Sequence, residues 1–179
     1  MSVRYIALLR AINVGGHTVS MEKLRGLFAE LNLKNVRSYI QTGNVFFEST
    51  ENRDDLQIKI EQHLRKNLGY DVPTCLRTVE EFEHALASAP FKDTTPDPED
   101  RYLIVFLSSP MPKDTQFPLV SPKQEYEIVG ATGQEAFVIM HLLNGKPGNP
   151  IYLEKMLTVK ATSRFYHTSV KILTAAKNV

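Results

Sequence analysis

The chain has 179 residues, of which 42% are hydrophobic, which is enough to bury the core of one domain or of two small halves. Its formal net charge of +1 excludes a strong overall attraction to polyanions. A single cysteine, Cys75, excludes an intrachain disulfide and a cysteine metal cluster, and no stretch reaches the roughly 18 apolar residues of a membrane span. We therefore expect a soluble, cytoplasmic protein without a membrane partner.

The first predicted element is a central strand over residues 3–9, because its apolar run, interrupted only by Arg4, is typical of a strand buried on both faces. Ser20 is a suitable N-cap for an amphipathic helix over residues 21–31, with Asn32 as a left-handed C-cap. Residues 36–47 predict two strands joined by a turn at 41–44, and a bulge in one long strand is the alternative. The next segments predict a helix from Leu56 to Leu68 that stops at Gly69 and a short strand over 72–77.

This order, strand–helix–strand–strand–helix–strand, predicts a ferredoxin-like split βαβ arrangement over residues 3–78. Thr78 and Glu81 match the capping box and begin a helix that ends at Pro90. The acidic, proline-containing stretch 91–100 is then the expected connection between two parts. The predicted fold class is α+β with two packed ferredoxin-like halves and a C-terminal helix: an N-terminal half over 1–90 and a C-terminal α/β half over 101–179.

The second half is predicted to contain a buried strand over 102–107, a proline-rich loop to residue 122, and a hairpin of 125–129 with 136–141. Asn149 and Pro150 suit the N-cap and first position of a helix that reaches Leu157. A last helix, capped by Thr162, is expected to present Phe165, Ser169, Ile172 and Ala176 along one face.

Two N-terminal motifs carry a resemblance to a known family. Residues 8–16 read Leu-Leu-Arg-Ala-Ile-Asn-Val-Gly-Gly, and residues 38–45 read Ser-Tyr-Ile-Gln-Thr-Gly-Asn-Val. With the segment 68–73 and Arg77-Thr78, they resemble the mostly bacterial family called domain of unknown function 1697, over essentially the whole chain. The resemblance implies an α+β protein with ferredoxin-like subdomains and no established activity.

The C-terminal part departs from the pattern of that family. Relatives tend to show Thr-x-Arg-Asn-aromatic-Asn-Thr, and residues 162–168 match it at Thr162, Arg164 and Thr168. Phe165 and His167 stand where the family has its two asparagines. If those amides bind a ligand in relatives, the resemblance implies that this chain binds it differently or not at all.

Polar residues of three distant segments are expected to converge on one pocket for an anion or a nucleotide. Arginine offers a charged fork to phosphate or carboxylate, and glycine-rich backbone lets N–H groups approach it. The candidate ligand-binding residues are Arg10, Asn13, Gly15, Gly16, Gln41, Thr42, Gly43, Asn44, Arg164 and Thr168. A purely structural interpretation stays open, because glycine and asparagine are also typical of turns that need positive φ. Neither glycine segment completes a P-loop or a GxGxxG pattern.

Three alternatives accompany the binding module. The first is an enzyme acting on a small phosphorylated substrate, with His17 as acid or base and Cys75 as a possible nucleophile, although Cys75 suits quiet packing better. The second is nucleic-acid binding, favoured by a topology shared with RNA-binding sheets, by basic chain ends and by aromatic residues beside Arg37 (Tyr39, Phe46 and Phe47). The third is an interaction protein that dimerises through a sheet edge or a helix, and the oligomeric state is unknown.

The five histidines show no metal-ligand spacing, so neither a metal nor a cofactor is expected.

Overall fold

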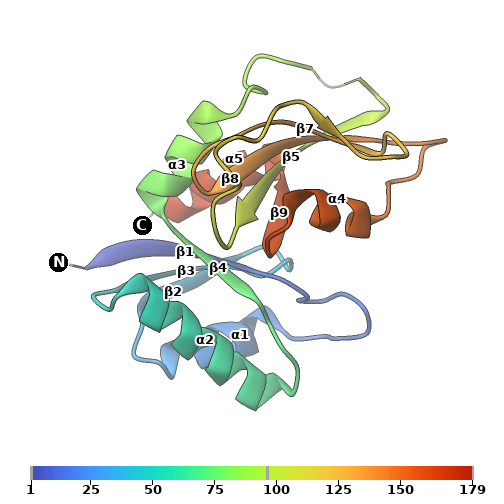
Figure 1. Ribbon diagram of the computed structural model, residues 1–179. Helices are drawn as coiled ribbons and strands as arrows, with labels where there is room; N and C mark the ends of the chain where they lie inside the picture. Colours follow the sequence, from blue (N-terminus) through green and yellow to red (C-terminus); the bar gives the residue numbers. More distant parts are fainter. Residues whose placement is uncertain (1, 96, 179) are drawn as a thin grey trace. The chain divides into compact units, whose positions relative to one another are not determined.

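The computed structural model describes residues 2–95 and 97–178. The chain divides into two compact units, the first formed by Met1–Phe82 and Ile172–Val179 and the second by Glu83–Lys171. Each unit contains one antiparallel sheet with its helices, which confirms the α+β fold class (Figure 1). Within the described residues, no helix combines the length and the apolar character needed to cross a membrane.

The first unit follows the predicted element order. It contains β1 (Val3–Leu9), α1 (Met21–Ala29), β2 (Lys34–Tyr39), β3 (Asn44–Ser49), α2 (Arg53–Leu68) and β4 (Thr74–Thr78). The strands form one antiparallel sheet in the order β2-β3-β1-β4. Helices α1 and α2 lie on the same face of this sheet (Figure 1).

The core of the first unit lies between the sheet and these two helices. Alternate residues of β1 (Tyr5, Ala7 and Leu9) pack there with Phe28 of α1 and Phe47 of β3. The residues of β1 between them, Ile6 and Leu8, are also fully buried, which confirms a central strand covered on both faces. The partly buried Arg4 lies on this second face too, because neighbouring strand residues such as Arg4 and Tyr5 point to opposite faces of the sheet.

Three helix ends of the first part of the chain agree with the signals in the sequence. The Ser20 hydroxyl accepts a hydrogen bond from the Lys23 N–H, and α2 ends at Gly69 in the left-handed conformation. Helix α3 (Val79–Ser88) begins with a complete capping box: the Thr78 N–H donates to Glu81 Oε2 at 2.8 Å, and the Glu81 N–H donates to Thr78 Oγ1 at 3.1 Å. Helix α1 ends two residues earlier than predicted, and its C-cap is Glu30 and not Asn32, although Asn32 does adopt a positive φ of 61°.

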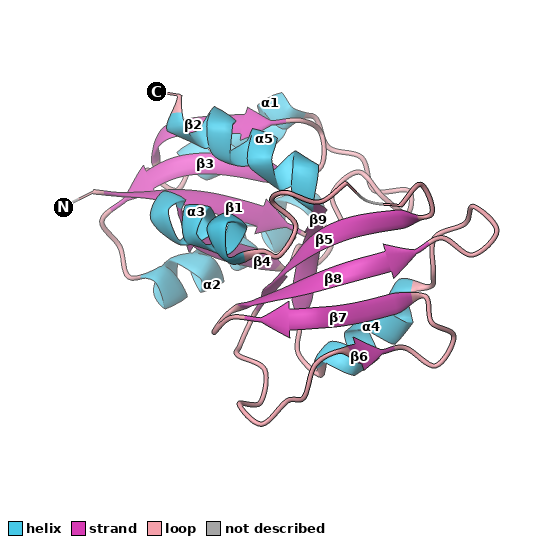
Figure 2. Cartoon of the chain, turned by 90° about the horizontal axis from the view of Figure 1, so that it is seen from above, coloured by secondary structure: helices cyan, strands magenta, loops and turns pink. Residues whose placement is uncertain are grey.

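The second unit is built around β5 (Asp100–Leu107). Its other elements are β6 (Leu119–Val120), β7 (Tyr126–Ala131), β8 (Glu135–His141), α4 (Pro150–Leu157), β9 (Ala161–Phe165) and α5 (Tyr166–Lys177). The sheet order is β6-β7-β8-β5-β9 (Figure 2). Without β6, this is the order of the first sheet, with α4 in the place of α2. No helix of the described chain lies in 108–118, the place that corresponds to α1.

One prediction about the C-terminal segment is wrong. Thr162 does not cap a helix but lies inside β9, opposite Phe106 of β5, and α5 begins only at Tyr166. Phe165 is therefore a strand residue, whereas Ser169, Ile172 and Ala176 are buried along α5 as predicted. The sequence of β9 contains no apolar run, so its extended conformation depends on pairing with β5.

The limits of the two units fall inside α3 and α5, each of which has residues in both. The domain limits proposed from the sequence, 1–90 and 101–179, stay a prediction.

Candidate functional site

Two predicted site segments of the first unit lie side by side. The Asn13 side chain donates from Nδ2 to the Gln41 carbonyl at 2.9 Å, and its Oδ1 accepts a hydrogen bond from the Val19 N–H at 2.8 Å. The Leu9 N–H donates to the Gly43 carbonyl at 2.8 Å. We call residues 10–19 and 40–44 the loop pair. Asn13 holds the two loops together, so the sequence motifs at 8–16 and 38–45 meet in space.

The loop pair is built from residues with left-handed backbone. Positive φ occurs at Ala11, Asn13, Gly15, Gly16, Ile40 and Gly43. At Gly43 a side chain is also excluded by space, because a Cβ there would lie 2.9 Å from Leu9 Cβ and 3.2 Å from Ile12 Cβ. At Gly15 and Gly16 a Cβ would meet no atom within 4 Å. Close packing therefore requires glycine at position 43. At positions 15 and 16, only the positive φ favours glycine over other residues.

Asn44 is the most deeply buried member of the predicted site. It is fully buried, and its Nδ2 donates to the Tyr39 carbonyl at 3.2 Å and to Thr42 Oγ1 at 3.0 Å. Both bonds close the turn between β2 and β3. Asn44 and Gly43 therefore shape the loop, as the structural interpretation of such residues expects.

Of the predicted site residues in the loop pair, Gly15, Gly16, Gln41 and Thr42 are exposed to solvent. The N–H groups of Gly15 and Gly16 have no hydrogen-bond partner in the part of the chain that the structure describes. Arg10 follows the end of β1 and is partly buried, and its backbone N–H donates to the Pro73 carbonyl at 2.9 Å. Exposed backbone donors and a guanidinium thus belong to one short loop, a combination suited to anions.

His17 stacks on a tyrosine in the same unit. The ring centroids of His17 and Tyr70 are 3.9 Å apart, and their planes differ by 22°. The Tyr70 hydroxyl is buried without a hydrogen-bond partner among residues 2–95 and 97–178. The imidazole of His17 makes no hydrogen bond in the same residues. Nothing described here orients it as a general base, since that role needs a hydrogen-bonded geometry.

The two remaining predicted residues, Arg164 and Thr168, belong to the second unit. Arg164 lies in β9, and its Nη1 donates to Thr162 Oγ1 at 3.0 Å and to the Ser163 carbonyl at 2.8 Å. Thr168 is in the first turn of α5. That they join the loop pair stays a prediction. Nearby, the rings of Phe165 and His167 stack with centroids 5.7 Å apart, so the two departures from the family pattern contact each other.

Cys75 lies in β4, where Arg77 Nη1 donates to its Sγ at 3.1 Å. The cysteine is buried, which favours a packing role. Among the residues that the structure describes, no three side chains of His, Cys, Asp or Glu gather as metal ligands would.

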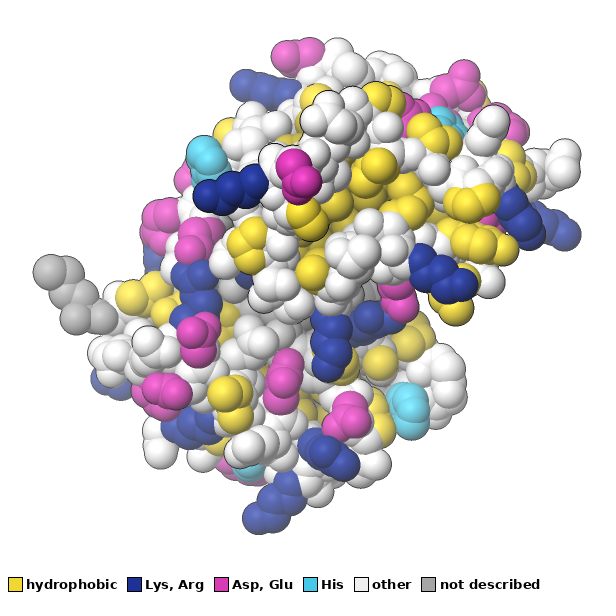
Figure 3. Space-filling view, in the orientation of Figure 1, with side chains coloured by type: hydrophobic (Ala, Val, Ile, Leu, Met, Phe, Trp, Pro, Cys, Tyr) yellow, Lys and Arg dark blue, Asp and Glu magenta, His cyan; other side chains and the backbone are white. Residues whose placement is uncertain are grey.

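Of the three aromatic residues considered for base stacking, Phe46 and Phe47 are covered by protein and Tyr39 is partly exposed. Phe47 is buried in the core, 5.6 Å from the ring of Phe28. Phe46 is 4% exposed, and the guanidinium of Arg37 lies over its ring at 5.5 Å. The molecular face drawn in Figure 3 carries acidic and basic side chains in alternation, without a continuous basic stripe. These features do not favour an RNA-binding sheet.

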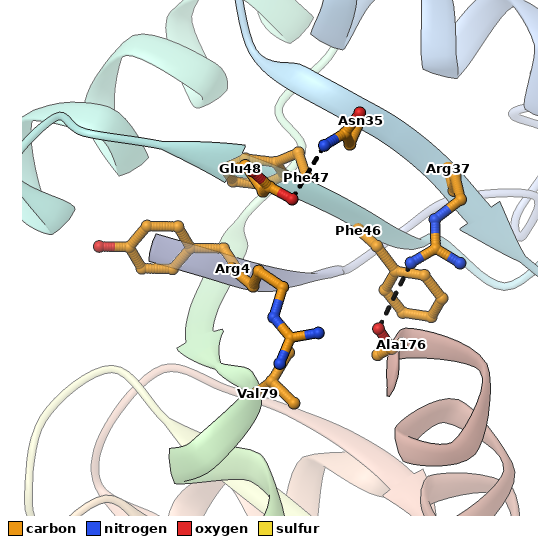
Figure 4. Close-up of a pocket in the computed structure, with 9 residues that line it drawn as sticks. Arg4, Asn35, Arg37, Phe46, Phe47, Glu48, Val79 and Ala176 are labelled. Carbon is orange, nitrogen blue, oxygen red and sulfur yellow. Dashed lines mark hydrogen bonds between the residues drawn. The ribbon is translucent and has the colours of Figure 1, made fainter. Parts of the chain in front are cut away.

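A functional candidate that the sequence predictions missed is Arg4. It lines a pocket on the face of the first sheet opposite α1 and α2 (Figure 4). The signal was visible in the sequence, because Arg4 is the one charge inside the apolar run of β1.

Comparison with known proteins agrees with this architecture. The family model described as "Protein of unknown function (DUF1697)" matches residues 2–137, more than half of the chain. The chain belongs to this family, which confirms the resemblance drawn from residues 8–16 and 38–45.

The solved structure of the conserved bacterial protein SP0830 from Streptococcus pneumoniae has a similar fold. It superimposes with a TM-score of 0.70 at 23% identity, over 99% of this chain and 100% of that one. This likeness concerns the fold. No curated protein matches the chain.

Proposed function

We propose that this protein is a cytoplasmic binding module for a small anionic or nucleotide-like ligand, held at the loop pair. The observation that carries the proposal is the Asn13 bridge, which joins the two loops and leaves the N–H groups of Gly15 and Gly16 exposed without a partner in the described residues. Successive backbone N–H groups in a turn can form a concave site that favours negative charge, and residues 15 and 16 lie in a turn.

The residues of the loop pair divide into two roles under this proposal. Arg10 supplies the positive charge, and Gly15 and Gly16 supply backbone donors. Asn13, Gly43 and Asn44 hold the loops in shape through the contacts described above. Gln41 and Thr42 are exposed at the rim and suit the polar part of a ligand.

Isothermal titration calorimetry with inorganic phosphate, adenosine monophosphate and citrate tests the proposal. We expect one of these anions to bind to the unaltered chain and the Arg10→Ala variant to lose most of that affinity, by about tenfold or more, because a charge-assisted pair contributes roughly 1.5–3 kcal/mol. Arg65→Ala is the matched control. Arg65 lies on α2, is 72% exposed and makes only a 3.4 Å contact with Asp71.

Equal affinity in the Arg10→Ala and Arg65→Ala variants would contradict the proposal. So would the absence of binding by all three anions at millimolar concentration, since such a site would then have no ligand of the class proposed. A rise of the melting temperature with ligand concentration gives an independent measurement, because a ligand that binds only the folded state stabilises it by mass action.

A further inference from the structure

The pocket beside Arg4 lies apart from the loop pair and shares no residue with it. It is lined by residues from β1, β2 and β3, by Val79 at the start of α3 and by Ala176 of α5, all in the first unit. The pocket is open to solvent. Figure 4 shows the Arg4 side chain extending toward Val79.

The guanidinium of Arg4 is not paired within the part of the chain that the structure describes. Its side chain is partly buried, and it makes no hydrogen bond or ion pair among residues 2–95 and 97–178. A charge that is partly removed from water without a partner costs free energy. An anion that entered the pocket would offset this cost.

Glu48, which lies opposite Arg4 in the sheet, forms a hydrogen bond with a different side chain. Arg4 and Glu48 are directly opposite each other on β1 and β3, a position where opposite charges usually pair. However, Glu48 Oε1 accepts a hydrogen bond from Asn35 Nδ2 at 2.9 Å, and the carboxylate is turned toward Asn35 (Figure 4). Asn35 holds a positive φ of 51° at this point of β2. The bond thus fixes Glu48 away from Arg4.

The second guanidinium of the pocket is also engaged. Arg37 donates to the carbonyls of Ala175 and Ala176 at 3.1 Å and 3.3 Å, and to the carbonyl of Asn178. Its Cζ lies over the ring of Phe46, 5.5 Å from the centroid. Arg37 therefore anchors the end of α5, and Arg4 is the arginine of this pocket whose donors face no protein acceptor in the described chain.

From this geometry we infer that the pocket binds a small organic carboxylate with a short aliphatic part. The fork of the Arg4 guanidinium matches the two oxygens of a carboxylate. Phe46, Val79 and Ala176 supply an apolar wall for the aliphatic carbons. Glu48 on the other side of the pocket repels a second negative charge, so a single charge is preferred.

A nuclear magnetic resonance titration of the full chain with sodium butyrate, at constant ionic strength, tests this inference. We expect the amide signals of Arg4, Phe46 and Val79 to shift with a saturating dependence on butyrate. Butyramide, which has the same shape without the charge, and succinate, which carries two charges, should shift them about tenfold more weakly. No shift of these amides with butyrate would overturn the inference.

Two variants that each remove one positive charge, Arg4→Gln and Lys34→Gln, test whether the Arg4 guanidinium binds butyrate. Arg4→Gln should weaken butyrate binding about tenfold or more, and Arg4→Lys should restore part of it, because a lysine keeps the charge without the fork. Lys34→Gln removes an exposed positive charge opposite the same Glu48 and should leave butyrate binding unchanged. Equal weakening by Arg4→Gln and Lys34→Gln would overturn the inference, because a general charge effect would then explain it. Succinate binding as tightly as butyrate would overturn the preference for one charge.

Discussion

Two glycines of the loop pair, Gly15 and Gly43, share a positive φ but differ in how closely other side chains pack against them. Gly15 and Gly43 both have a positive φ, 61° and 76°, but a Cβ at Gly15 meets open space, whereas one at Gly43 meets Leu9 and Ile12. The two glycines therefore allow the cost of backbone strain to be separated from the cost of a steric clash.

We expect Gly43→Ala to lower the free energy of unfolding by about 3 kcal/mol, since positive-φ strain and overpacking against the buried Leu9 add together. Gly15→Ala should cost only about 1 kcal/mol, from backbone strain alone. Urea unfolding followed by circular dichroism measures both. Equal losses in the two variants would show that the contact with Leu9 and Ile12 is easily relieved.

Arg4 allows a second prediction at this scale. Because its partly buried guanidinium has no partner in the described chain, Arg4→Met should raise the free energy of unfolding by about 1 kcal/mol when no carboxylate is added. Denaturant unfolding in chloride buffer is the measurement. A loss of stability would show that the guanidinium stabilises the fold, and the energetic basis of the carboxylate inference would then be wrong.

Among the elements, the last turn of α5 depends on a side chain from a distant strand. The carbonyls at a helix C-terminus lack partners within the helix, and here Arg37 of β2 donates to those of Ala175, Ala176 and Asn178. The positive charge is also favourable at this end of the helix dipole. Arg37 thus closes α5 in the way that a capping residue would.

Arg37→Met should therefore release the end of α5. We expect faster amide hydrogen exchange over residues 172–178 and a stability loss of about 2 kcal/mol, because hydrogen bonds from a charged donor are lost. Lys34→Met, an exposed change on the same strand, is the control. If exchange in α5 were the same in both variants, the helix end would be held by packing alone.

The capping box at the start of α3 predicts a modest change in the free energy of unfolding. Thr78→Ala removes the hydroxyl that accepts from the Glu81 N–H, so a loss of about 1 kcal/mol is expected. Thr50→Ala, at an exposed threonine outside any cap, should change the unfolding midpoint in urea very little. A similar loss in both variants would argue against the capping box.

For the molecule as a whole, two tyrosines of the second unit predict sensitivity to alkali. Burial raises the pKa of Tyr126, assisted by Glu125, and burial raises the pKa of Tyr166, assisted by Asp93. The Tyr126 hydroxyl donates to the Gly148 carbonyl at 2.9 Å. In the unfolded chain both titrate near pH 10. Their contribution to stability is thus complete below about pH 10 and is lost as the pH rises through the higher folded-state pKa values.

We expect the free energy of unfolding to fall with pH above about 10, and the fall to be smaller in Tyr126→Phe. Urea unfolding at a series of alkaline pH values, with tyrosinate absorbance as a second signal, measures this. An unchanged slope in Tyr126→Phe would show that Tyr126 titrates alike in both states. Tyr39→Phe, at a partly exposed tyrosine of the first unit, is the control.

Local signals in the sequence were sufficient for most of the elements. The apolar run of β1, the Ser20 cap, the stop at Gly69 and the box at Thr78 each act within a few residues, so each could be read directly. The family motifs at 8–16 and 38–45 also mark the two loops that meet. Strand β9 could not be predicted in this way, because its five residues are extended only through pairing with β5, more than fifty residues earlier in the chain.

The sequence alone determined the α+β class, the helix caps at Ser20, Gly69 and Thr78 and the glycine turns, because these depend on neighbours along the chain. Only the tertiary structure decided that Asn13 joins the two loops, that Arg37 closes α5 and that Glu48 turns from Arg4 to Asn35. The first two contacts join residues that are distant in the sequence. In the third, Glu48 has two neighbours on adjacent strands, Arg4 and Asn35, and the sequence does not show which one it contacts. Their outcome depends on sheet register and side-chain direction, which no local pattern contains.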